Sequence, residues 1–118
     1  MLINLSNHPS SGWSDEQLRD CAPYGEVVDM PFPRVDPAWG EADVARVADE
    51  VCRRILAMED VRAVHVAGEH TLTFAVVTRL LRAGVCCLTS TTDRIVQDLP
   101  DGQMVKTFRF VRLRKYEM

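Results

Sequence analysis

Short apolar runs alternate with longer amphipathic segments along the first 90 residues of the chain. Strands are expected at four apolar runs: residues 2–5, 26–30, 63–67 and 85–89. Helices are expected at three segments between them: residues 15–22, 41–54 and 71–82. Strands that alternate with helices indicate right-handed crossovers and a mainly parallel sheet.

The ends of the expected helices carry recognisable signals. Ser14 begins a capping box in which Gln17 is expected to reach back to the cap, and Pro23 stops the helix. Gly84 is expected to end the third helix. The apolar stripe of that helix is expected to comprise Phe74, Val77, Leu80 and Leu81.

The pattern changes after residue 89. A polar loop is expected at residues 90–94, and segments 95–99 and 104–116 flank an Asp-Gly turn, which predicts an antiparallel hairpin. We therefore expect one α/β domain over residues 1–118. It would have a mainly parallel sheet, helices on both faces, and the C-terminal hairpin at one edge.

Composition excludes several classes of protein. The 47% hydrophobic and 26% charged fractions of the 118 residues are those of a soluble globular domain. A net charge of −3 gives no general attraction to long nucleic acids or to anionic membranes. No apolar run is long enough for a membrane span and the first residues lack a basic leader, so we expect a cytoplasmic protein.

The four cysteines are expected to be structural. The chain has no C-x-x-C pair, so a zinc site is not expected and no cofactor is implied. Cys86 and Cys87 are adjacent in an expected strand and should point to opposite faces.

Polar residues follow the ends of the expected strands. In a parallel sheet these connections meet at one edge, where ligands bind and where helix N-termini attract anions. The motifs for dinucleotides and nucleoside triphosphates are absent, so a phosphate-bearing ligand would be held by hydroxyl and N–H groups. The ordinary alternative is that these hydroxyls only cap helices and turns. The candidate ligand-binding residues are Asn7, Ser10, Ser11, Gly68, His70, Thr71, Thr73, Ser90, Thr91, Thr92 and Arg94.

Two residues of these loops are candidates for proton transfer. His8 follows the first strand, and a histidine titrates near neutral pH. Glu69 precedes the third helix, whose positive end favours the ionised carboxylate. His65 lies inside a strand and is expected to be a hydrogen-bonded core residue.

Aromatic residues leave further alternatives open. Trp13 and Trp39 follow polar or proline-rich loops and are expected to pack on the sheet more than to stack on a base. The C-terminal segment 106–116 interleaves basic and aromatic residues. This pattern suits single-stranded nucleic acid, but protection of a sheet edge or a dimer interface is favoured.

The N-terminal sequence resembles that of small CRISPR-associated proteins from type III loci. The resemblance is carried by segments 3–9, 13–14 and 16–17. Further matches are Gly68, Glu69, Thr71 and Thr73 ahead of Phe74 and Ala75, and Ser90, Thr91 and Thr92 with Arg94. Several of these families look like compact versions of the CARF domain, a Rossmann-like sensor. The resemblance implies homodimers that bind cyclic oligoadenylates across the interface, and in some members cleave them as ring nucleases.

Three functions follow as hypotheses. In the first, a ribose 2′-hydroxyl attacks the adjacent phosphate without a metal, and His8 or Glu69 transfers the proton. Thr71, Thr73, Ser90 and Thr91 would hold phosphate and Arg94 would balance its charge. The second is a sensor or sponge that binds the same ligand without chemistry. The third is a structural or interaction protein.

Overall fold

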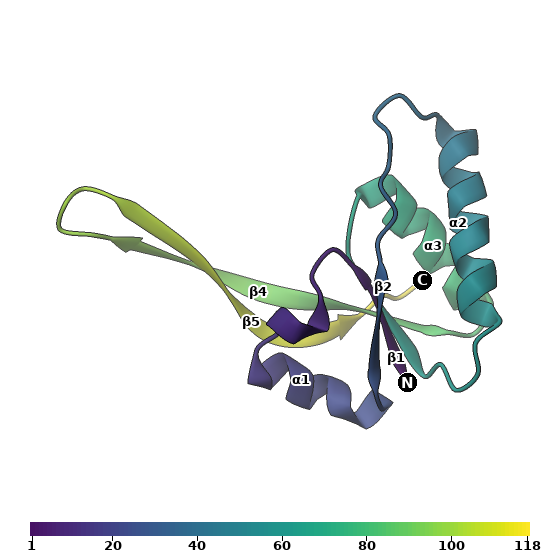
Figure 1. Ribbon diagram of the computed structural model, residues 1–118, viewed down its shortest axis with the longest axis horizontal. Coiled ribbons are helices and arrows are strands. Elements are labelled where there is room, and N and C mark those ends of the chain that lie inside the picture. The colour runs from purple at the N-terminus through teal and green to yellow at the C-terminus, as the bar shows by residue number, and fades with distance from the viewer.

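The computed structural model describes residues 1–118 and contains one five-stranded sheet (Figure 1). The strand order is β2-β1-β3-β4-β5; the first four strands are parallel and β5 is antiparallel to β4. The α/β fold with its C-terminal hairpin is therefore confirmed. The elements are β1 (Leu2–Ser6), η1 (Ser10–Gly12), α1 (Asp15–Cys21), η2 (Ala22–Tyr24), β2 (Val27–Pro31), α2 (Glu41–Leu56), β3 (Ala63–Val66), α3 (His70–Arg82), β4 (Cys86–Asp98) and β5 (Met104–Lys115).

Helices cover both faces of the sheet. Ile3 and Val64 belong to the larger core, which α2 and α3 complete. Leu2 and Ala63, their neighbours in sequence, face the other way and form a smaller cluster with Cys21 of α1. Figure 1 shows the parallel strands between α1 on one side and α2 with α3 on the other. The alternation of side chains along each strand thus gives the sheet two apolar faces.

The amphipathic pattern predicts α2 well and α3 less well. In α2, apolar residues at helical spacing that include Val44, Val51 and Ile55 are buried. In α3 the buried residues are Leu72, Val76, Val77 and Leu80. Phe74, expected in that stripe, is 72% exposed, so this prediction is wrong. Phe74 lies two positions from Leu72, about 200° around the helix, and therefore faces away from the sheet.

The expected loop at residues 90–94 is also wrong, because β4 continues through it to Asp98. β5 pairs with this extension residue by residue: Ser90 lies opposite Leu113, and Arg94 lies opposite Phe108. One irregularity in the register occurs between Thr91 and Thr92. Hydroxyl and charged residues at this point mark a solvent-exposed ribbon rather than a loop, since threonine favours extended structure.

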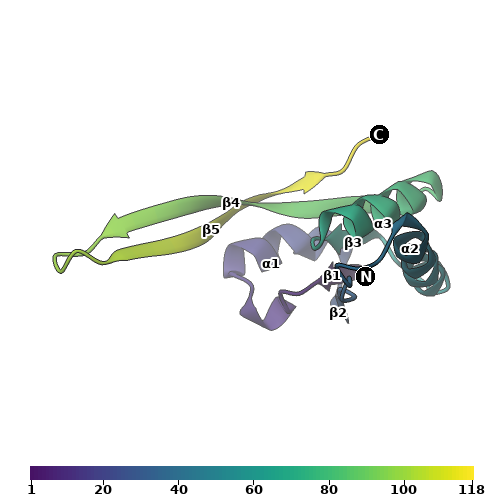
Figure 2. The ribbon, with the colours of Figure 1, turned by 90° about the horizontal axis from the view of Figure 1, so that it is seen from above.

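The outer part of the hairpin projects from the rest of the molecule. We call residues 93–109 the arm, and all other residues the body. Figures 1 and 2 show the arm as a twisted two-stranded ribbon, and the molecule measures 52 Å along its longest axis. Exposed large apolar side chains on the arm include Val96, Met104 and Phe108. None of the helices has both the length and the hydropathy required to cross a bilayer.

Candidate functional site

Three strands place a polar side chain on the face of the sheet that α1 covers. Asn4 of β1 and His65 of β3 are 1% and 4% exposed, and Ser90 of β4 is half-buried. They lie two positions after Leu2, Ala63 and Leu88, the apolar residues of the same face. A parallel register sets Asn4 opposite His65, so polar groups from distant parts of the chain meet under α1.

The hydrogen bonds of these residues fix the state of the imidazole. His65 Nε2 lies 2.7 Å from Ser90 Oγ, and Nδ1 lies 3.2 Å from Asn4 Oδ1. Because the Asn4 amide nitrogen donates to the His8 carbonyl and to Asp29 Oδ1, its oxygen faces His65 and only accepts. The hydrogen therefore resides on Nδ1, and Nε2 accepts the hydroxyl hydrogen of Ser90.

Burial keeps the imidazole neutral. Burial first, and the proximity of His8 second, lower the pKa of His65 to about 4. The Trp13 ring lies over the imidazole, with ring centroids 5.1 Å apart. At neutral pH His65 is therefore an uncharged hydrogen-bonded residue, and the prediction of a core histidine is confirmed.

Asp29 anchors the other end of this polar network. Its carboxylate accepts from the Asn4 amide at 2.9 Å and from both the N–H and the hydroxyl of Ser10. The Asn4 bond first, and then the Ser10 bonds, hold the pKa of Asp29 below its usual value. Ser6 Oγ donates to Asn4 Oδ1 at 2.8 Å. The loop after β1 is thus tied to β1 and β2, and the hydroxyl of Ser10 is already bonded.

Gln17 joins α1 to the network. Ser14 caps α1 as expected, since its hydroxyl accepts from the Gln17 N–H at 3.1 Å. The second half of the predicted capping box is wrong: the Gln17 side chain is buried and its Nε2 donates to Ser90 Oγ at 2.9 Å. A bond to Ser90, on the face of the sheet that α1 covers, has replaced the local bond to the cap.

A groove of about 820 Å³ opens beside this network, between the body and the start of the arm. His8, Trp13 and Gln17 line one side of it. Phe108, 70% exposed, and Arg109 are among the residues contributed by the hairpin. The remaining lining residues are Gly12, Ser14, Thr92, Ile95, Thr107 and Phe110.

Trp13 and Arg109, which line the groove, each contact another residue of the chain. The Trp13 indole N–H donates to the His8 carbonyl at 3.1 Å, which fixes the ring beside the histidine. The Arg109 guanidinium lies 3.8 Å from the Asp93 carboxylate, and both side chains are about two-thirds exposed. Such an exposed pair is weak, so Arg109 remains able to contact an anion.

The N-terminus of α3 is occupied by a residue of the chain itself. The Glu69 carboxylate accepts from the N–H groups of Thr71 and Leu72 at 2.9 and 2.8 Å, and from the Thr71 hydroxyl. These bonds, that of the Thr71 hydroxyl first, hold the pKa of Glu69 below its usual value. Glu69 therefore caps the helix and Thr71 is bonded to this cap, and neither residue lines the groove.

The loop before α3 is shaped by packing. A Cβ atom on Gly68 would lie 2.5 Å from the buried Phe32 ring, so this position requires glycine for space. His70 is exposed at the first turn of α3, and Thr73 Oγ1 is buried without a hydrogen-bond partner. Thr71 lines a different cavity, of about 430 Å³, together with Trp39 and Phe74.

The predicted site residues are thus divided between two places. His8 and Thr92 line the groove, and Ser90 lies behind it against Gln17 and His65. The loop after β1 leads to α1 on one face and the loop after β3 leads to α3 on the other, so the sheet separates them. Outside the groove lining lie Asn7, Ser10, Ser11, Gly68, His70, Thr71, Thr73, Thr91 and Arg94, together with Glu69.

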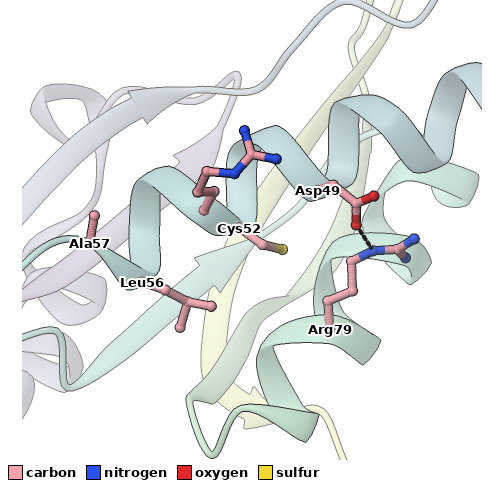
Figure 3. A pocket seen from close by; sticks show the side chains of 6 residues that line it. Asp49, Cys52, Leu56, Ala57 and Arg79 are labelled. Carbon is pink, nitrogen blue, oxygen red and sulfur yellow. Dashed lines mark hydrogen bonds and ion pairs between the residues drawn. The ribbon is translucent and has the colours of Figure 1, made fainter.

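A further hollow, of about 580 Å³, lies between α2 and α3 (Figure 3). Asp49 Oδ1 and Arg79 Nε form an ion pair across it at 2.7 Å. Cys52 points into the same hollow, but burial raises the pKa of its thiol. Burial likewise raises the pKa of Cys21 to about 11 and that of Cys87 to about 12, so these thiols are unreactive core residues.

Several residues of the network and groove were not among the sequence-based candidates. Asn4, Asp29, Gln17, Phe108 and Arg109 belong to this group. The alternation of side chains along the strands contains a signal for the network. Asn4 and His65 are polar residues at positions whose side chains face the buried side of the strand. Nothing local in the sequence brings the hairpin residues next to His8. No group of three or more His, Cys, Asp or Glu side chains is arranged to hold a metal ion.

Comparison with known proteins places the chain in a family. No curated protein and no solved structure matches it. Residues 1–114 match the family model described as the uncharacterized protein MJ1673 family. Since the match covers nearly all of the 118 residues, this chain belongs to the MJ1673 family.

Proposed function

We propose that this protein binds a cyclic oligoadenylate in the groove and cleaves it by a metal-independent route, as a ring nuclease of type III CRISPR antiviral defence acting in the cytoplasm. The observation that carries the proposal is the lining of the groove. A histidine, a guanidinium and two aromatic rings lie around one cavity: His8, Arg109, Trp13 and Phe108. These are groups that transfer protons, bind phosphate and stack on bases.

The aromatic residues supply base recognition. Trp13 is fixed by its bond to the His8 carbonyl, and Phe108 presents most of its surface to solvent. Stacking of a base on an aromatic side chain contributes about 1–3 kcal/mol. Two rings in one groove, one from the loop before α1 and one from the hairpin, suit successive adenines of one ligand.

The Arg109 guanidinium supplies the charge for phosphate. Its two-pronged donor geometry matches a phosphodiester, and the groove also holds the hydroxyls of Thr92 and Thr107. A phosphate in the groove would compete with Asp93 for Arg109. Since that ion pair is exposed and long, the competition costs little.

His8 supplies proton transfer. In the proposed reaction the ribose 2′-oxygen forms a bond to the adjacent phosphorus while the bond from phosphorus to the 5′-oxygen breaks. The 2′-hydroxyl loses a proton and the 5′-oxygen gains one, and the products end in a cyclic phosphate and a 5′-hydroxyl. His8 exchanges one of these protons, a role that contributes 10²–10⁴-fold to such reactions.

In this proposal two copies of the chain share one ligand ring. A cavity of this volume accommodates a ligand of drug size, about one or two nucleotide units. A ring of four or more units would therefore extend beyond one groove. The apolar side chains of the arm are uncovered in the single chain and favour an interface between two copies.

Incubation of the purified protein with cyclic tetra-adenylate and cyclic hexa-adenylate tests the proposal. We expect linear products with cyclic phosphate ends, and a 10²–10⁴-fold slower reaction for His8→Ala with ligand affinity retained. His70→Ala is the matched control, since His70 is an exposed histidine outside the groove. Tight binding without products would instead support a sensor or sponge. Neither binding nor cleavage of any ring would contradict the proposal.

The phosphate contact has its own matched pair. Arg109→Ala should weaken ligand binding at least tenfold, whereas Arg94→Ala should leave it nearly unchanged. Both arginines are exposed residues of the hairpin, but only Arg109 lines the groove. Equal losses in the two variants would point to general charge attraction rather than to the groove.

A further inference from the structure

The polar network behind the groove holds a group that the proposed ring cleavage does not use. We propose that Ser90 is a nucleophile activated by His65, and that it accepts a phosphoryl group from a phosphorus ester bound at the groove. This goes beyond the proposed function, in which the attacking oxygen belongs to the ligand. Here the attacking oxygen belongs to the protein.

Ser90, His65 and Asn4 form a hydrogen-bonded chain. Ser90 Oγ lies 2.7 Å from His65 Nε2, and His65 Nδ1 lies 3.2 Å from Asn4 Oδ1. A hydroxyl bonded to a base, which is in turn oriented by a third residue, is the arrangement that activates serine in covalent catalysis. The three residues come from β4, β3 and β1, adjacent strands of a parallel sheet, so a rigid scaffold holds them.

The tautomer of His65 suits a general base. The Asn4 amide is oriented by two acceptors, the His8 carbonyl and the Asp29 carboxylate, and its oxygen therefore faces His65. This leaves Nε2 with a lone pair directed at the Ser90 hydroxyl. A base that is uncharged and already bonded to the nucleophile needs no rearrangement before it accepts the proton.

Ser90 is only half-buried, whereas His65 and Asn4 are fully covered. Gln17 connects the two regions, since this residue lines the groove and its Nε2 donates to Ser90 Oγ at 2.9 Å. The Arg109 guanidinium lines the same groove and favours a phosphorus ester over a neutral electrophile.

The step balances without any further reactant. Ser90 Oγ forms a bond to phosphorus as the bond from phosphorus to the leaving group breaks. The hydroxyl proton of Ser90 moves to His65 Nε2, and from there to the leaving group. Hydrolysis of the phosphoserine by water would restore the hydroxyl.

A fluorophosphonate probe tests the inference on the intact chain, without any cyclic nucleotide. In this reaction the bond from phosphorus to fluorine breaks, fluoride leaves, and the Ser90 proton passes to His65. We expect one adduct per chain by intact mass, located at Ser90 by peptide mapping. Ser90→Ala should abolish it, and Ser11→Ala, which alters an exposed serine outside the network, should not.

The labelling rate of His65→Gln distinguishes activation by His65 from a merely structural hydrogen bond, because loss of a structural bond would not slow labelling. Labelling should slow at least 100-fold in this variant, with folding checked by circular dichroism. In the wild type, labelling should persist at pH 5.5, because burial keeps His65 uncharged where an exposed histidine would be mostly protonated. Absence of an adduct on the folded wild type, an adduct at another serine, or equal rates with and without His65 would each overturn the inference.

Discussion

The body and the arm both carry large apolar side chains, but the body buries them and the arm exposes them. In the body, apolar side chains fill two clusters on the two faces of the sheet. On the arm, Phe108, Met104 and other large apolar side chains remain exposed on a ribbon of only two strands. Two-stranded ribbons are marginally stable alone. The body therefore holds the buried apolar contacts that stabilise the fold, whereas the large apolar side chains of the arm are exposed to solvent.

The largest contrast is expected for apolar truncations. Leu80→Ala removes a fully buried side chain of α3 and should lower the free energy of unfolding by about 2–5 kcal/mol. Met104→Ala removes a side chain that is 60% exposed and should change it by less than about 0.5 kcal/mol. Urea denaturation of both variants measures the difference. Similar losses would mean that the arm contributes to the core of the fold.

Acid should destabilise the body through His65. The pKa of this histidine is about 4 in the folded chain and near 6.5 when unfolded, so the unfolded chain binds a proton first as pH falls. Stability is therefore full above about pH 6.5 and declines toward pH 4, by roughly 3 kcal/mol. Asp29 and Glu69, whose carboxyl pKa values are lowered, contribute losses at still lower pH.

Thermal unfolding between pH 4 and 7 measures this effect, and His65→Gln provides the comparison. The pH dependence of the variant should be flatter through the same range. If wild type and variant lose stability in parallel, another titrating group is responsible.

Two glycines distinguish crowding in the body from backbone strain in the arm. Gly68→Ala should cost about 1–3 kcal/mol, because the new Cβ would overlap the Phe32 ring. Gly102 has a φ of +83° in the turn of the arm, with open space around it. Gly102→Ala should cost about 1 kcal/mol, and Gly102→Asn less, because asparagine tolerates this conformation. Asparagine at both positions makes the test sharper. An unchanged free energy of unfolding in Gly68→Asn would refute the packing argument.

The smallest expected effect comes from the cap of α3. Glu69→Ala removes the acceptor of the Thr71 and Leu72 N–H groups and should cost about 1 kcal/mol. Glu69→Asp should restore part of this loss, since aspartate is a favoured cap. Cleavage of a cyclic oligoadenylate should continue in both variants, because Glu69 does not line the groove. Complete loss of turnover with stability intact would return Glu69 to the catalytic site.

The sequence predicts most of the body because its signals there are local. The spacing of Val44, Ala48 and Val51 is sufficient to place α2, and the apolar runs place β1 and β3. The error at Phe74 arises because α3 carries apolar residues on more than one side, so periodicity leaves its phase open. Only packing against the sheet selects Leu72, Val76 and Leu80.

The arm and the groove could be predicted only in part. The Asp-Gly turn correctly predicts the hairpin. The polar segment 90–94 taken alone favours a loop, because the strand that pairs with it, β5, comes later in the chain. His8 could be named from sequence as an acid–base candidate. The position of Phe108 and Arg109 beside His8 could not be predicted, because the length and direction of the hairpin bring them there. Likewise, the contact between His65 and Ser90 depends on the sheet register.

Titration calorimetry with a shortened arm tests the central claim, that the groove between body and arm binds the ligand. Thr92 and Phe110 are paired, so a two-residue Asn-Gly turn can replace residues 93–109 without changing the body. Wild-type protein should bind cyclic tetra-adenylate or cyclic hexa-adenylate, and the shortened protein should keep its melting temperature but lose binding. Equal affinity of the two proteins for the same ring would contradict the account.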